Sequence, residues 1–161
     1  MGNMIKVGMA DLNVCKAPDA ITTLGLGSCV GVAIWDKRNK IGGLLHAMLP
    51  DSTAIRNNTN RAKFVDTGLA DLIKKMESMG CNKINMVAKL AGGAKMFALS
   101  GNSAIGNVGE RNAEAAKAEL RKYGIKLIAE DTGLNYGRTV ELYAESGDYL
   151  IKSVGKPVKT I

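Results

Sequence analysis

The chain has 161 residues, of which 46% are hydrophobic and 23% charged, and its formal net charge is +7. This composition is ordinary for a globular protein with a buried core, so we expect one domain over residues 1–161. No run of about 18 apolar residues exists, so we expect no membrane insertion. Only 4% of residues are aromatic and Lys/Arg blocks are short, so we expect no nucleic-acid binding. A solvated basic surface accounts for the charge; if it serves binding, an acidic protein is the favoured partner.

The cysteines Cys15, Cys29 and Cys81 are odd in number and widely spaced. This argues against a disulfide framework and favours a reducing compartment. The chain has one histidine and no CxxC motif, so we expect no metal site. The first residues, "MGNMIKVGMA", lack a basic region followed by an apolar one, which is the pattern of a secretory signal. We therefore expect a cytoplasmic protein.

The first half of the chain predicts several strands and then a helix. The strands are expected at residues 5–9, 20–24, 30–35 and 41–48. A polar loop, "PDSTAIRNN", follows. A helix is predicted over residues 60–79, ended by Gly80. Its apolar residues recur on one face: Val65, Leu69, Leu72, Met76 and Met79.

The second half predicts strand, helix and strands again. A strand over residues 84–90 runs into a Gly-rich loop, and a helix starts at Asn107 with Glu110 in capping-box spacing. Three strands follow near residues 126–129, 138–143 and 149–154. This order is not a regular βαβα alternation, so we predict an α+β fold with mixed, mostly antiparallel sheets.

A cysteine and the only histidine stand on two neighbouring predicted strands. Cys29 lies in "TLGLGSCVGVAIWD" and His46 follows 17 residues later in "GGLLHAMLP". If the loop between the strands is Lys37–Arg38, Cys29 lies directly opposite His46; with a four-residue loop the two are diagonal neighbours. A three-residue loop would put them on opposite faces.

The apolar pattern favours the two-residue loop, because it collects Val30, Val32 and Ile34 on a core face. The face of Cys29 and His46 then carries small residues such as Gly31 and Gly42, which would leave room for a ligand. Directly paired residues have Cβ atoms roughly 4.5–5.5 Å apart, close enough for a thiol–imidazole contact.

This pairing is chemically useful, since an imidazole can take the proton of a thiol and later protonate a leaving group. Gly25, Gly27 and Gly31 would let a substrate approach the backbone closely. The N–H groups of Ser28 and Cys29 are candidates for an oxyanion hole. Free cysteine is also among the most buried residue types, so a core role for Cys29 and a structural role for His46 stay open.

Two other catalytic templates fit less well. "GSCVG" matches the nucleophile elbow of α/β-hydrolases, but that fold requires a histidine far downstream of the nucleophile. A papain-like site also places its histidine more than about a hundred residues after the cysteine. The Gly-rich stretches "LAGGAKMF" and "NVGERN" are not Walker A sequences, and we interpret them as structural loops.

Five segments in this order resemble the chemoreceptor glutamine deamidase family, CheD. They are "TLGLGSCVGVAIWD", "KIGGLLHAMLPDS", "KLAGGAKMF", "VGERNAEAAKAEL" and "DTGLNYGRTVEL", and the resemblance covers nearly the whole chain. One departure is Leu134, where a second glycine is expected after Gly133.

The resemblance implies a triad of Cys29 as nucleophile, His46 as base and Thr23 as third member. The chemistry of the residues alone would have pointed to Asp36 or Asp51 in place of Thr23. It further implies a sheet sandwich flanked by helices, similar to deamidating toxins. The implied reaction converts chemoreceptor glutamines to glutamate through a thioester, with no cofactor. A second implied partner is the CheC phosphatase. The alternative is a regulatory module that binds CheC with little or no turnover.

Overall fold

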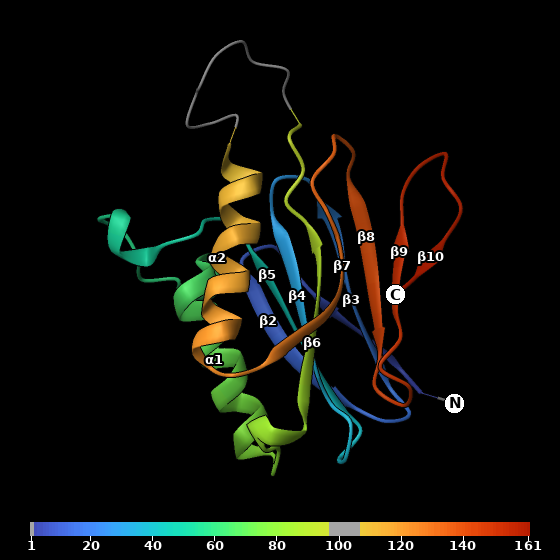
Figure 1. Ribbon diagram of the computed structural model, residues 1–161. Coiled ribbons are helices and arrows are strands. Elements are labelled where there is room, and N and C mark those ends of the chain that lie inside the picture. The colour runs from blue at the N-terminus through green and yellow to red at the C-terminus, as the bar shows by residue number, and fades with distance from the viewer. Residues whose placement is uncertain (1, 97–106) are drawn as a thin grey trace.

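A computed structural model describes residues 2–96 and 107–161. Two five-stranded sheets pack face to face, and two helices cover the outer face of one of them (Figure 1). The first sheet has the order β1-β3-β8-β9-β10 and the second the order β2-β5-β4-β6-β7. The predicted α+β class is therefore confirmed, with the layers arranged as helices, sheet and sheet.

The strands of the first sheet are β1 (Met4–Val7), β3 (Ala20–Leu26), β8 (Arg138–Tyr143), β9 (Tyr149–Lys152) and β10 (Lys159–Thr160). Those of the second are β2 (Asp11–Lys16), β5 (Ile41–Ala47), β4 (Val30–Asp36), β6 (Met86–Gly92) and β7 (Lys126–Thr132). The helices are α1 (Val65–Ser78) and α2 (Val108–Lys122), with short 3-10 turns at Ser52–Ala54, Arg61–Lys63 and Lys83–Asn85.

Most of the strand pairs are antiparallel, as predicted. The pairs β1–β3 and β6–β7 are parallel, and the pairs on either side of β4 are antiparallel. Strands β2 and β10 were not predicted from the sequence. β2 carries polar residues at both ends and in its middle, and β10 has only two residues, too few for an alternating pattern.

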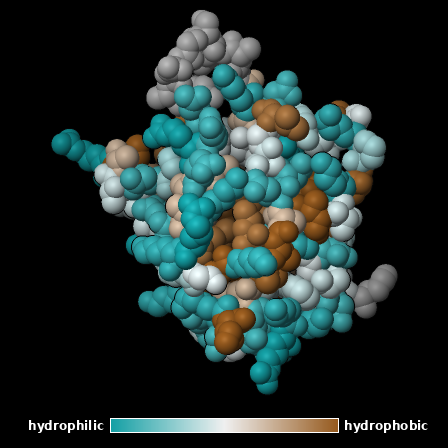
Figure 2. Space-filling model, in the orientation of Figure 1, coloured by the Kyte–Doolittle hydropathy of each residue, from teal (hydrophilic) through white to brown (hydrophobic). Residues whose placement is uncertain are grey.

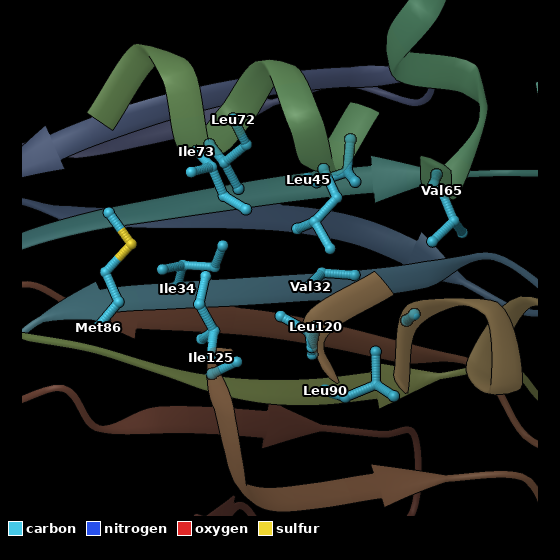
Figure 3. Packing of buried hydrophobic residues seen from close by; sticks show 14 of the residues in the cluster. Val32, Ile34, Leu45, Val65, Leu72, Ile73, Met86, Leu90, Leu120 and Ile125 are labelled. Carbon is cyan, nitrogen blue, oxygen red and sulfur yellow. The ribbon is translucent and has the colours of Figure 1, made fainter. Parts of the chain in front are cut away.

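The outer core lies between the helices and the second sheet (Figure 3). Val32 and Ile34 of β4 and Leu45 of β5 point toward the buried side chains of α1 and α2. The alternation of these strands therefore sends one set of side chains to the helices and the other set to the first sheet. The helix side of the cluster includes Val65, Leu69, Leu72, Ile73, Met76, Ala116 and Leu120.

The inner core fills the space between the two sheets, and here one expectation is wrong. The face that carries His46 was predicted to leave room for a ligand beside its glycines. A Cβ on Gly31 would lie 2.8 Å from the Tyr149 hydroxyl, and one on Gly42 would lie 2.8 Å from Leu142. The small residues therefore admit large side chains of the opposite sheet, which the hairpin pattern alone does not reveal.

The helix ends also differ from prediction. α1 begins at Val65, because residues Arg61–Lys63 form a 3-10 turn, and Met79 is a C-cap residue that is 40% exposed. Asn107 does cap α2, but its side chain makes no capping hydrogen bond, so the predicted capping box is not formed.

The surface in the view of Figure 2 is mostly hydrophilic, with an apolar area near the centre of that face. Neither described helix is both long and apolar enough to cross a membrane.

Candidate functional site

The β4–β5 hairpin has a four-residue connection, so the favoured two-residue loop is wrong. Asp36 pairs with Ile41 and Gly31 pairs with His46. The Asp36 carboxylate accepts hydrogen bonds from the backbone N–H groups of Arg38 and Asn39, which stabilises this wider turn. Cys29, two residues before Gly31, is thus the diagonal neighbour of His46, the second register considered above.

Thr23 and His46 meet across the two sheets. Thr23 Oγ1 lies 2.7 Å from His46 Nδ1 and 2.8 Å from the carbonyl oxygen of Val7. A carbonyl can only accept, so the Thr23 hydroxyl donates its one proton to Val7. Nδ1 must then carry a proton and donate it to Thr23. The neutral ring therefore has its lone pair on Nε2.

The free nitrogen of His46 is enclosed. His46 is 1% exposed, and Nε2 has no hydrogen-bond partner among the described residues. Cys29 is 8% exposed and belongs to the inner core cluster, between the same two sheets that enclose His46. Burial lowers the pKa of His46 and raises the pKa of the Cys29 thiol, so both groups are favoured in their neutral forms.

The segment around Cys29 is held by three successive carbonyl groups. Ala94 N–H donates to Gly27 O at 2.9 Å, Asn112 Nδ2 to Ser28 O at 2.9 Å, and Gly93 N–H to Cys29 O at 2.9 Å. A Cβ on Gly92, whose φ is 101°, would overlap the Cys29 carbonyl oxygen. The segment around Cys29 thus packs directly on the end of β6 and on the backbone that follows it.

The structure distributes the three predicted substrate-binding residues over β3 and the turn that follows it. Gly25 is exposed, has φ 70°, and sits in a register shift between Thr23 and Leu26. Gly27 is half-buried, and a Cβ there would lie 3.2 Å from Met96. Ser28 is half-buried beside Cys29. Gly25 therefore also has a structural role, because its positive φ suits the register shift within β3.

Asp36 and Asp51, the acidic residues considered as hydrogen-bond partners of His46, bind backbone N–H groups elsewhere. Asp36 binds the hairpin turn at the far end of β4, and Asp51 caps a 3-10 turn through the Thr53 N–H. The hydroxyl that approaches His46 comes from β3, which is in the other sheet.

Two buried polar side chains in this part of the fold were not predicted from the sequence. Asn112 of α2 is fully buried, and Arg138 of β8 pairs with Asp131 at 3.0 Å while it donates to the carbonyl of Gly133. Both stand in the segments quoted for the family resemblance, but no spacing rule distinguishes them from solvated residues. Their burial depends on the docking of α2 and β8.

The other two cysteines are less suited to thiolate chemistry. Burial, together with Asp19, raises the pKa of Cys15 to about 11. Burial, with a contribution from Asp36, raises the pKa of Cys81 to about 12. Burial also raises the pKa of the Cys29 thiol, but no carboxylate adds to this effect, and the backbone N–H of Cys29 acts in the opposite direction.

The family profile "CheD chemotactic sensory transduction" matches residues 48–153. The chain is also 58% identical, over all of both chains, to the "Probable chemoreceptor glutamine deamidase CheD" of Lachnoclostridium phytofermentans. The chain belongs to the CheD family. A CheD protein of the same printed name from Caldanaerobacter subterraneus is 51% identical over 98% of each chain. One from Clostridium botulinum is 52% identical over 94% of this chain and 93% of its own.

Proposed function

We propose that this CheD protein is an enzyme that deamidates chemoreceptor glutamine side chains to glutamate in the cytoplasm, with Cys29 as nucleophile and His46 as base. The observation that carries the proposal is the Thr23–His46 hydrogen bond, which puts the basic lone pair on the buried Nε2. The diagonal strand position of Cys29 beside His46 supports the same assignment. The names of the relatives supply the substrate class.

In the first half of the reaction, Cys29 Sγ attacks the carboxamide carbon while its proton passes to His46 Nε2. The carbonyl becomes a tetrahedral oxyanion, for which the N–H groups of Ser28 and Cys29 are the candidate donors. His46 then gives its proton to the nitrogen, the carbon–nitrogen bond breaks, and ammonia leaves. A thioester between Cys29 and the receptor side chain remains.

In the second half, water attacks the thioester carbon and gives a proton to His46. The carbon–sulfur bond breaks, the receptor leaves as glutamate, and the thiol is restored by the proton on His46. Burial raises the pKa of the Cys29 thiol and lowers the pKa of His46, so burial favours the neutral thiol and the neutral imidazole before substrate binds. Thr23 holds the ring in one tautomer throughout.

We also propose that the CheC phosphatase binds at this site. The support is the family resemblance, together with the net charge of +7, which suits an acidic partner surface. If CheC and receptor bind the same surface around Cys29, CheC inhibits deamidation competitively with receptor. A ternary complex of receptor fragment, this protein and CheC would place CheC on a different face.

The test of the proposed activity uses mass spectrometry on purified receptor cytoplasmic fragments. Fragments incubated with the wild type or with Cys81→Ala should show the Gln-to-Glu mass increase, and those incubated with Cys29→Ala should not. Cys81 is the matched control, because it is also a buried free cysteine. Unchanged fragments with every protein, combined with CheC binding, would favour the regulatory module without turnover.

A further inference from the structure

Asn112 connects α2 to both catalytic strands. Its side-chain Nδ2 donates to Ser28 O and to Met48 O, each at 2.9 Å. Ser28 immediately precedes Cys29, and Met48 lies two residues after His46. One fully buried amide group therefore joins the nucleophile segment to the end of the strand that carries the base.

The orientation of this amide is fixed by its partners. Both neighbours are carbonyl oxygens, which only accept, so the nitrogen must face them. The oxygen Oδ1 is buried and has no hydrogen-bond partner among the described residues. A flipped amide would bring three oxygens together and leave both carbonyls without a donor, a costly arrangement in a buried site.

Fixing the Ser28 carbonyl has a consequence for the Cys29 N–H. The two groups belong to one planar trans peptide unit and point in opposite directions. Asn112 therefore sets the direction in which the Cys29 N–H points. Among the described residues, no other residue accepts a hydrogen bond from this N–H. It is thus available beside the nucleophile.

We propose that Asn112 is a positioning residue for the oxyanion hole: by holding the Ser28 carbonyl, it aims the Cys29 N–H at the oxygen that becomes negative when the sulfur attacks. This inference rests on the proposed function. Gly109, one helical turn before Asn112, supports the geometry from the same helix. A Cβ on it would overlap the Ala94 carbonyl, so α2 packs directly on the Gly93–Ala94 backbone that holds the neighbouring carbonyls.

The test compares a reaction that forms an oxyanion with one that does not. Deamidation passes through a tetrahedral oxyanion, whereas alkylation of Cys29 by iodoacetamide displaces iodide at a saturated carbon. Asn112→Ala should lower kcat for receptor-fragment deamidation by about 10- to 100-fold, with KM little changed. The alkylation rate of Cys29 and its pH profile should stay near those of the wild type.

Leu120→Ala is the control for lost stability, because Leu120 lies two turns further along the same buried face of α2 and packs in the outer core. It should unfold more easily than the wild type and keep its kcat. An unchanged kcat in Asn112→Ala would overturn the inference. Equal losses of kcat and alkylation rate would also overturn it, since they indicate a general disturbance of Cys29 and His46.

A measurement on the wild type covers the case in which Asn112→Ala does not fold. The side-chain NH2 protons of Asn112 should exchange with solvent much more slowly than those of Asn60, which is exposed and donates to Ala10 O at 3.3 Å. Equally fast exchange would remove the basis of the inference. Absence of turnover in the wild type would instead overturn the proposed function and leave this exchange result unaffected.

Discussion

Thr23 of β3 and His46 of β5 are joined by a 2.7 Å hydrogen bond between two different sheets. Thr23 is itself anchored to Val7 on β1, so the ring orientation depends on three strands. The relationship links the packing of the sandwich to the protonation of one nitrogen. Any change that separates the sheets at this point also changes which ring nitrogen can act as a base.

Thr23→Val removes the hydroxyl and keeps the shape of the side chain. Without an acceptor at Nδ1, the ring is free to take the other tautomer, and we expect kcat to fall by about 10- to 100-fold, part of the roughly 10²–10⁴ that a general base contributes. Cys29→Ala should be inactive. Thr22→Val is the matched control, since buried Thr22 donates to Val140 O at 2.7 Å in the same strand. Its kcat should be unchanged; equal losses in both variants would contradict the tautomer argument.

The stability of the protein should decrease as the pH falls through the histidine range. Burial lowers the pKa of folded His46 below its ordinary value, so the unfolded chain takes up a proton at a higher pH than the folded one. The contribution of His46 to the free energy of unfolding is therefore fully present above about pH 6.5 and decreases below it. Urea unfolding between about pH 7.5 and pH 5.5 measures this, because the chain has one histidine and carboxyl groups titrate lower.

His46→Asn provides the comparison for this pH series. It should show a nearly flat free energy of unfolding over the same range. A slope as steep as that of the wild type would assign the effect to other groups.

Gly92→Ala should damage both stability and activity. Its φ of 101° costs about 1–2 kcal/mol for a residue with a Cβ. Overlap with the Cys29 carbonyl adds roughly 1–3 kcal/mol and displaces the segment around Cys29. Gly80 has a similar φ of 97° with open space around it. Gly80→Ala should therefore lose only the stability that the backbone conformation costs, and its kcat should stay unchanged. Thermal unfolding and deamidation assays on both variants would separate the two effects.

Leu134→Gly should stabilise the protein by about 0.5–1 kcal/mol. Leu134 has φ 61°, a left-handed conformation that favours glycine, and its side chain is 64% exposed and contributes little packing. This backbone geometry explains why a glycine is expected at this position. Leu24→Gly is the control, because Leu24 is 62% exposed and lies in β3. Leu24→Gly should lower the free energy of unfolding measured by chemical denaturation. If both substitutions raised it, the effect would lie in the unfolded chain and not in the backbone conformation of Leu134.

Local pattern was sufficient to predict the hairpin that carries Cys29 and His46, because alternation of side chains needs only neighbouring residues. Local pattern did not predict which residues of the two strands pair, because the hydrogen bonds of Asp36 stabilise a wider turn than the one expected. Thr23 was reached only by family resemblance. Its contact with His46 joins strands of different sheets, and no spacing along the chain encodes that meeting.

The contacts of Asn112 likewise could not be predicted from the pattern of residues along its helix. Its place in a helix was predictable, but it occupies a position where an exposed polar residue is equally compatible with the pattern. Only the packing of α2 on the Gly93–Ala94 backbone turns it toward Ser28.

The central claim is that Cys29 forms a thioester with a receptor glutamine. Hydroxylamine tests it most directly, because it intercepts a thioester and leaves a hydroxamate on the side chain that was attacked. We expect mass spectrometry to find hydroxamate and glutamate at the same receptor position with the wild type and with Cys81→Ala, and neither product with Cys29→Ala. Glutamate formed by Cys29→Ala at the wild-type rate, or formed by the wild type with no hydroxamate at any hydroxylamine concentration, would contradict it.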